Sequence, residues 1–348
     1  MSNIKRNVIN SAKSNVVEMA HGNGGRAMAE FIDTLFIAAF NNGQLNQKTD
    51  ASCFHTQQGR MVMTTDGHVI SPLFFPGGNI GSLSIHGTIN DIAMMGALPR
   101  YISCGFILEE SYPLSDLSDI VLAMAKAAKE ANVEIITGDT KVVEKGKADG
   151  VFITTTGIGE LASGINISPQ HIHAGDKIIV NGSLGDHGIS ILAQRNTLGF
   201  ETSLQSDSAS LSDLVQTILA SFSTELHCLR DPTRGGLAAT LNELAQQSKL
   251  GFSLDEDAIP IKDEVDAACE LLGLDPLYIA NEGKFVAFCS AYAANDILSL
   301  IKQHPLGKEA AIIGEVTHDP RYLVELTTPY GGKRIVHWRY DDQLPRIC

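Results

Sequence analysis

The sequence lacks several patterns that would place it in common classes of protein. Its six cysteines include no Cys-x-x-Cys pair, which disfavours a zinc site or a redox pair. No apolar run approaches the ~18 residues of a membrane-spanning helix. The polar N-terminal stretch has no apolar segment typical of a signal peptide. Basic runs, repeats and low-complexity segments are also missing, so neither nucleic acid nor a membrane is an expected partner. We expect a cytoplasmic globular protein.

The length of the chain favours two domains, and its negative charge favours phosphate binding through cations and backbone amides. A chain of 348 residues exceeds one ordinary core and fits two domains of ~150 residues. We expect an N-terminal arm and first helix at 1–45, domains at 46–160 and 170–325, and a tail at 331–348. The net charge is −14. Acidic proteins usually bind phosphates through cations and backbone amides.

The first half alternates predicted strands and helices in the order βαβαββ. The expected strands are 61–65, 100–108, 133–137 and 151–157, and the expected helices are 81–95 and 117–131. Asp66 and Asp139 directly follow two of these strands, where the active sites of sheet proteins gather. Asp91 lies in an apolar helix, where a carboxylate is costly to bury unless it is paired or bound to a cation. A solvated or capping aspartate is the alternative.

These three aspartates predict a magnesium site, because Mg²⁺ is usually held by a few carboxylates together with nucleotide phosphates. Lys141, two residues after Asp139, would add a phosphate partner. Glycine-rich turns at 21–25, 182–188 and 231–236 each precede a predicted helix. A helix start exposes free N–H groups, so three such turns favour a polyphosphate site at a domain junction. The turn residues assigned to this site are Gly24, Gly25, Asp231, Gly235 and Gly236.

The second half is predicted to contain strands at 177–180, 284–289 and 311–316, the last of them followed by the tail. Gly331 and Gly332 suit a hinge, and Pro345 favours an extended arm that leads to Cys348. A thiol on such an arm can act as a covalent carrier that enters and leaves a catalytic site. The alternative is a frayed chain end whose residue type means little.

Several motifs together resemble a known family. They are Thr64-Thr65-Asp66, Pro72-Leu73-Phe74-Phe75-Pro76-Gly77-Gly78, Asn90-Asp91-Ile92-Ala93-Met94-Met95-Gly96, Thr137-Gly138-Asp139-Thr140-Lys141-Val142-Val143, Asp231-Pro232-Thr233-Arg234-Gly235-Gly236, Ala280-Asn281-Glu282-Gly283 and Pro345-Arg346-Ile347-Cys348. The Asn-Asp and Thr-Gly-Asp motifs alone indicate the wider PurM-like (aminoimidazole ribonucleotide synthetase) superfamily. The last motif narrows the resemblance to the HypE family, the carbamoyl dehydratases of nickel–iron hydrogenase maturation.

The resemblance implies a two-domain PurM-like α/β fold that dimerises through its N-terminal sheets, binds ATP and Mg²⁺, and carries a flexible C-terminal tail. It implies that HypF places a carbamoyl group on the terminal thiol. The protein then dehydrates this thiocarbamate to a thiocyanate, with ATP hydrolysed to ADP and phosphate. The cyano group passes to iron held by the HypC–HypD complex and becomes a cyanide ligand of the hydrogenase centre.

Residue roles follow from the same resemblance. Cys348 is expected to carry the group, with Glu282 and Lys141 around it, and Asp66, Asp91 and Asp139 bind the metal and nucleotide. The remaining nucleotide-binding assignments are Asn90 and Thr140, beside the turn residues given above. Two positions depart from the family pattern: Asn79 stands where aspartate is common and Ser82 where lysine is common. These two departures bear on whether the turn Pro76-Gly77-Gly78 contributes a carboxylate ligand to the metal.

Two other functions fit parts of the sequence. Another ATP-dependent PurM-like synthetase would need no terminal cysteine. A non-catalytic thiol carrier or scaffold would present Cys348 to partners without turning over ATP. For single residues, Glu282 as a helix-start or salt-bridge carboxylate and Lys141 as a surface lysine remain the plain alternatives.

Overall fold

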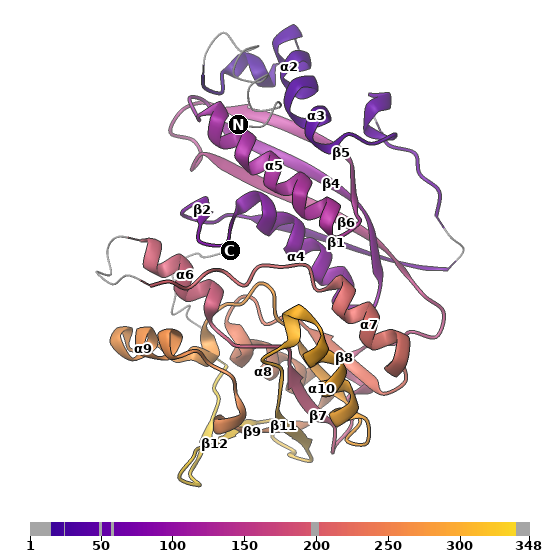
Figure 1. Ribbon diagram of the computed structural model, residues 1–348, viewed down its shortest axis with the longest axis vertical. Helices are drawn as coiled ribbons and strands as arrows, with labels where there is room; N and C mark the ends of the chain where they lie inside the picture. Colours follow the sequence, from indigo (N-terminus) through magenta and orange to yellow (C-terminus); the bar gives the residue numbers. More distant parts are fainter. Residues whose placement is uncertain (1–14, 24, 49–50, 57–58, 196–201, 339–348) are drawn as a thin grey trace.

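The computed structural model describes residues 15–23, 25–48, 51–56, 59–195 and 202–338. Strands of the N-terminal half form a four-stranded sheet, strands of the C-terminal half form a seven-stranded sheet, and a short two-stranded hairpin is separate. Figure 1 shows the two halves one above the other, with α4 and α7 near their boundary. The predicted α/β fold with two domains is confirmed. No helix within the described ranges combines the length and apolar character needed to cross a membrane.

The N-terminal sheet has the strand order β1-β6-β4-β5, in which only β4 and β5 run parallel. Its strands are β1 (Arg60–His68), β4 (Leu98–Glu109), β5 (Glu134–Val143) and β6 (Val151–Leu161). The predicted βαβαββ order is confirmed, but two strand ends were predicted wrongly. The first strand continues past Asp66 to His68, and β5 continues past Thr137 to Val143. Asp139 therefore lies within a strand and not after its carboxyl end.

Helices cover one face of this sheet. They are α4 (Ile80–Met94) and α5 (Leu114–Glu130), and the hairpin of β2 (Phe74–Phe75) and β3 (Gly78–Asn79) precedes α4. Asn79 caps α4, because its Oδ1 accepts hydrogen bonds from the backbone N of Gly81 at 2.8 Å and of Ser82 at 3.2 Å. The residue that departs from the family pattern thus begins a helix in this chain.

The N-terminal segment packs beside β5. Its short helices are η1 (Met19–Gly22), α2 (Arg26–Phe31), η2 (Ile32–Ile37), α3 (Ala38–Phe40) and η3 (Leu45–Gln47). Phe36 packs against Phe106 of the sheet, with ring centroids 4.8 Å apart and the ring planes tilted by 49°. The side chain of Asn42 donates to the backbone oxygen of Ile135 at 2.8 Å. Between these helices and β5 lies a mainly apolar cavity of about 320 Å³.

The C-terminal sheet has the order β13-β12-β9-β11-β7-β10-β8. Its strands are β7 (Lys177–Val180), β8 (Leu226–Arg230), β9 (Gly251–Asp255), β10 (Val286–Cys289), β11 (Ala311–Thr317), β12 (Val324–Thr327) and β13 (Lys333–Ile335). The helices are α6 (Asp186–Gln194), α7 (Ser212–Phe222), α8 (Gly236–Ser248), α9 (Asp263–Leu272) and α10 (Ala294–Gln303), with short turns η4 (Pro169–His171), η5 (Glu256–Ala258), η6 (Pro276–Tyr278) and η7 (Pro305–Gly307).

Both faces of this second sheet are covered. Neighbouring residues of β7 point to opposite sides, as the pleat requires. Ile179 joins the core that α7 and α10 build, whereas Ile178 and Val180 join the core that α8 builds. All three side chains are fully buried.

The end of the C-terminal domain corrects two predictions. The strand β11 is not the last, because β12 and β13 follow it as a hairpin. Gly331 and Gly332 form the turn of that hairpin and not a hinge: the N of Gly331 donates to the Thr328 oxygen, and the N of Thr328 donates to the Gly332 oxygen, both at 2.8 Å. Val336 is still fully buried. Any arm therefore begins after this residue, and Pro345 and Cys348 lie outside the described residues.

Candidate active site at the domain junction

One buried amide joins the two domains. The Nδ2 of Asn90 on α4 donates to the backbone oxygens of Ala209 and Glu282, each at 3.0 Å. Its Oδ1 accepts from the N of Leu211 at 2.8 Å. The side chain is 1% exposed, so solvent does not compete for these bonds. Asn90 thus fixes two loops of the second domain against the first.

Two carboxylates of the first domain lie beside this contact. Thr64 of β1 donates from Oγ1 to Asp91 Oδ2 at 2.8 Å. Asp66 lies two residues after Thr64 on the same face of β1, and its Oδ2 is 3.6 Å from Nε2 of the buried His68. Asp66 and Asp91 therefore come together where β1 packs on α4.

The second domain adds two further carboxylates through loops packed backbone to backbone. Asn281 donates from Nδ2 to the Pro232 oxygen at 3.0 Å and binds the loop 231–236 to the segment 279–283. A Cβ on Gly236 would lie 2.6 Å from the Ile279 oxygen, and its φ is +62°, so glycine is required here. This packing carries Asp231 and Glu282 to the junction.

Burial and neighbouring negative charges raise the pKa values of three of these carboxyl groups, those of Glu282, Asp231 and Asp91. Burial raises the pKa of Glu282 well above its usual value, and the charges of Asp207, Asp231, Asp66 and Asp91 raise it further. Burial and the neighbouring Asp91 raise the pKa of Asp231 to about 7. Burial is also the main reason that the pKa of Asp91 is raised. Such a group is stabilised in its ionised form by a divalent cation, and Mg²⁺ prefers carboxylate oxygens.

Cationic side chains surround this cluster, and the sequence analysis did not assign them. Arg234 is exposed, and its charge acts on Asp91 and His68. The Nζ of Lys284 lies 3.1 Å from Asp207 Oδ2, with both side chains largely buried. Burial alone would raise the pKa of Asp207, but Lys284, the charge of His187 and the backbone N–H of Glu282 together outweigh it, and the pKa is lowered. Arg234 lies within a motif that was recognised, whereas residues 207 and 284 carry no local signal.

The predicted site residues separate into two groups. The first group lies at the domain junction and comprises Asp66, Asn90, Asp91, Asp231, Gly235, Gly236 and Glu282. The second group lies along β5 and the start of α2 and comprises Gly25, Asp139, Thr140 and Lys141. Gly24 and Cys348 lie outside the described residues.

The separation corrects the prediction of one three-aspartate metal cluster within a chain. Strand pairing aligns Asp66 with Thr155, but it aligns Asp139 through Gly105 with Thr154. Side chains of successive residues on a strand point to opposite faces of the sheet, so residues aligned with Thr154 face the side opposite to those aligned with Thr155. The strands β5 and β1 also lie at opposite edges of this sheet. Asp139 therefore faces away from α4, where its Oδ1 accepts from the Nζ of Lys141 at 2.8 Å. This hydrogen bond lowers the pKa of Asp139.

Comparison with known proteins defines the class first. Models of the AIR synthase related protein family match residues 48–161 for the N-terminal domain and 173–326 for the C-terminal domain. Thiamine monophosphate kinase from Aquifex aeolicus, at 19% identity and a TM-score of 0.59 over 79% of this chain and 89% of that one, shares the fold alone. The chain thus has both halves of an AIR synthase-related protein.

More similar relatives narrow the class. Carbamoyl dehydratase HypE of Azotobacter vinelandii is 57% identical over 95% of this chain and 97% of its own length. The Escherichia coli protein of that name is 46% identical over 96% of this chain and 100% of its own. A crystal structure of HypE in complex with ATP is 44% identical, with a TM-score of 0.91, over 95% of this chain and 99% of that one. The chain belongs to the carbamoyl dehydratase HypE family.

Proposed function

We propose that this protein is a hydrogenase maturation enzyme that dehydrates a carbamoyl group carried as a thiocarbamate on Cys348. The product is a thiocyanate on the same sulfur, and ATP is hydrolysed to ADP and phosphate. The observation that carries the proposal is the cluster of Asp66, Asp91, Asp231 and Glu282 at the domain junction of a HypE family member. A relative of known structure binds ATP.

The chemistry explains why such a site uses ATP. A carbamoyl oxygen is a poor leaving group, and transfer of the γ-phosphoryl group to it creates a good one. The C–O bond to phosphate then breaks, the nitrogen loses its remaining protons, and the S–C≡N group is left. Water must be kept away, because it would attack the activated carbon.

The residues of the junction divide these tasks. Asp66, Asp91 and Asp231 are the proposed Mg²⁺ ligands, and the cation would neutralise charge on the transferring phosphoryl group. The glycine turn at 231–236 and Arg234 are placed to bind the phosphates. Glu282 is the proposed base, since a carboxyl with a raised pKa is suited to accepting a proton near neutral pH. Its backbone is held on both sides, by Asn90 and by Asp207.

A homodimer completes the proposal. The face of the N-terminal sheet opposite α4 exposes Met61, Met63 and Ile107, which are 39%, 72% and 42% exposed. A second copy would cover this apolar face in an isologous contact. Asp139 and Lys141 lie on the same face, so in the dimer they act on the site of the other protomer, beside its carbamoyl group.

Partner proteins supply and remove the carried group. HypF is the proposed carbamoyl donor, and a relative that is 42% identical has been solved in a HypE–HypF complex, with a TM-score of 0.78 over 90% of this chain and 99% of that one. The HypC–HypD complex is the proposed acceptor of the cyano group. The cytoplasm is the proposed location of these three reactions.

Intact mass of the protein after incubation with HypF, carbamoyl phosphate and ATP tests the function. The expected result is a carbamoyl adduct that then loses one water. Cys348→Ala removes both mass changes, whereas Cys53→Ala, at a cysteine that the structure shows to be exposed, keeps them. An adduct that never loses water would identify a thiol carrier. ATP turnover that survives in Cys348→Ala and needs no carbamoyl donor would identify a different synthetase.

A further inference from the structure

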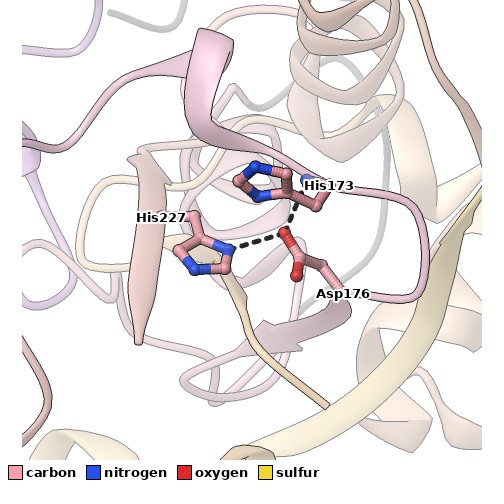
Figure 2. Close-up of side chains that lie close together, drawn as sticks. All are labelled: His173, Asp176 and His227. Carbon is pink, nitrogen blue, oxygen red and sulfur yellow. Dashed lines mark hydrogen bonds and ion pairs between the residues drawn. The ribbon is translucent and has the colours of Figure 1, made fainter. Parts of the chain in front are cut away.

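Three side chains with metal-binding groups meet at the start of the C-terminal domain, away from the junction. They are His173 and Asp176, which lie between η4 and β7, and His227 of β8. One nitrogen of each imidazole and one carboxylate oxygen all lie within 4.8 Å of one another. Figure 2 shows the three side chains turned toward one another. It is the one such group of three or more among the residues that the structure describes.

The backbone around these residues is already fixed. The Asp176 Oδ2 accepts from the backbone N of His173 and from Nδ1 of His227, both at 2.8 Å. The N of Ser168 donates to the His227 oxygen at 3.0 Å, and the N of Val316 donates to the Asp176 oxygen at 2.9 Å. The loop that carries two of the three groups is therefore tied to β8 and to β11.

His173 supplies the freedom that metal binding needs. Its side chain is exposed, and within the described part of the chain its ring makes an edge-to-face contact with His227 and no hydrogen bond. Ligand atoms around a tetrahedral zinc ion stand ~3.4 Å apart, given metal–ligand bonds of ~2.0–2.1 Å. Asp176 Oδ2 and His227 Nδ1 are 2.8 Å apart and share a proton, so the metal ion would replace that proton and move the two atoms slightly apart. Rotation of the exposed His173 imidazole would bring in the third ligand.

The donor set selects a class of metal. Two imidazole nitrogens and one carboxylate suit zinc and its first-row neighbours, whereas Mg²⁺ and Ca²⁺ prefer sites made of oxygen. Asp176 contributes a negative charge that is largely buried, and Glu225 adds another charge near His227. Three protein ligands would leave one coordination position for water or a partner's group.

This group is separate from the proposed ATP site. The strand β8 runs from His227 toward Asp231 of the junction, and four residues of strand span ~13 Å. We propose that His173, Asp176 and His227 form a binding site for a zinc-class divalent metal ion. Bound metal would fasten the connection between the two domains to the C-terminal sheet. His227 is distant in sequence from His173 and Asp176, so no local motif indicates that the three residues meet.

The test is titration of chelator-treated full-length protein with Zn²⁺ by calorimetry, and with Co²⁺ by visible absorption. All proteins carry Cys53→Ala and Cys348→Ala, so that exposed and terminal thiols do not bind the ion. The expected result is one ion per chain, with affinity at least ~10-fold weaker in His173→Ala and in His227→Gln. His55→Ala, at an exposed histidine in the first domain, should bind like the parent.

Three outcomes would overturn the proposal: no binding by the parent, equal affinity in His173→Ala, or displacement of Zn²⁺ by excess Mg²⁺. Thermal unfolding gives an independent reading that does not depend on activity. Saturating Zn²⁺ should raise the Tm of the parent by about 2 °C or more and leave that of His173→Ala unchanged. An equal rise in both proteins would show that the ion binds elsewhere.

Discussion

The two sheets of this protein differ in how many of their faces are covered by helices. The seven-stranded sheet is covered by helices on both faces, and Ile178, Ile179 and Val180 of its interior strand β7 are fully buried. The four-stranded sheet has helices on one face, and Met63 on the other face is 72% exposed. The first arrangement is complete within one chain. The second leaves an exposed apolar face and a pair of charged residues, Asp139 and Lys141, whose proposed use depends on a second copy.

The largest expected effect comes from testing whether the two groups of site residues act across a dimer. Asp91→Asn and Asp139→Asn should each lower ATP hydrolysis at least 100-fold, on the order expected for lost stabilisation of a phosphoryl transition state. Each change removes a charge and leaves the shape of the side chain, so the circular dichroism spectrum should not change.

Mixing the two inactive variants then tests whether Asp139 acts in the site of its own chain or in that of the partner. If Asp139 serves the partner's site, an exchanged mixture should recover about a quarter of the parent activity, since half of the dimers are mixed and each of these has one intact site. No recovery after verified subunit exchange would place Asp91 and Asp139 in one chain's site.

The open face can be tested without any substrate. Met63→Lys would place a charge in the proposed dimer contact and should weaken dimerisation at least 10-fold, because a buried unpaired charge is costly. Sedimentation over a range of protein concentrations measures this. Leu271→Lys is the matched control, because Leu271 is 67% exposed on α9 of the other domain. Equal dissociation constants for the two variants would remove the open face from the contact.

The pH dependence of stability should have opposite signs at the two sites. A carboxyl whose pKa is raised by folding stabilises the fold while it is protonated. For Asp231, whose pKa rises from 3.8 to about 7, that contribution is present in acid and is lost as the pH rises to about 7. Urea unfolding from pH 5 to 8 should show the free energy falling by about 2–4 kcal/mol, and Asp231→Asn should remove much of the fall.

The exposed Asp257→Asn serves as a control and should follow the parent curve. Asp139 has a lowered pKa, so its smaller contribution is present above its usual pKa and is lost only as the solution becomes acidic. A parent curve that is flat from pH 5 to 8 would contradict the raised pKa at the junction.

The smallest expected effect concerns Gly25 and Gly236, which both lie in glycine-rich turns that precede helices. Gly236→Ala should destabilise the fold by about 1–3 kcal/mol, because its Cβ would meet the Ile279 oxygen and its φ is positive. Gly25→Ala should change stability by less than about 0.5 kcal/mol, since a Cβ there meets nothing within 4 Å. Chemical denaturation measures both, and similar values would mean that the loop 231–236 can shift.

Much of the architecture could be predicted from local patterns. The strand predicted at 177–180 is β7, and the helix predicted at 117–131 is α5. The end of β5 could not be predicted, because Gly138 and the polar residues after it look like a turn. Pairing with β4 continues the strand there: a Cβ on Gly138 would lie 2.4 Å from the Cys104 oxygen, so this glycine permits close contact between strands. The short strands β12 and β13 likewise depend on neighbours distant in sequence.

The candidate site was predicted in part for the same reason. Asp66, Asp91, Asp231 and Glu282 lie in motifs with their own local signal, and the structure brings them together. The ion pair of Asp207 and Lys284 is formed by residues from two distant segments, and neither segment alone indicates it. Whether Asp139 belongs with the others depends on which face of the sheet it occupies, and that is decided only by strand register.

The side chain of Asn90 has a consequence for how ATP would enter. Its three hydrogen bonds use two donors and one acceptor, and of similarly shaped side chains only an amide offers both. Aspartate lacks the donors and leucine lacks all three groups. Each bond contributes about 0.5–1.5 kcal/mol, and a swing of one domain away from the other would break all three together. The two domains are therefore held at a fixed separation, and we expect the proposed nucleotide to be selected by its fit to the groups at the junction and not by closure of one domain on the other.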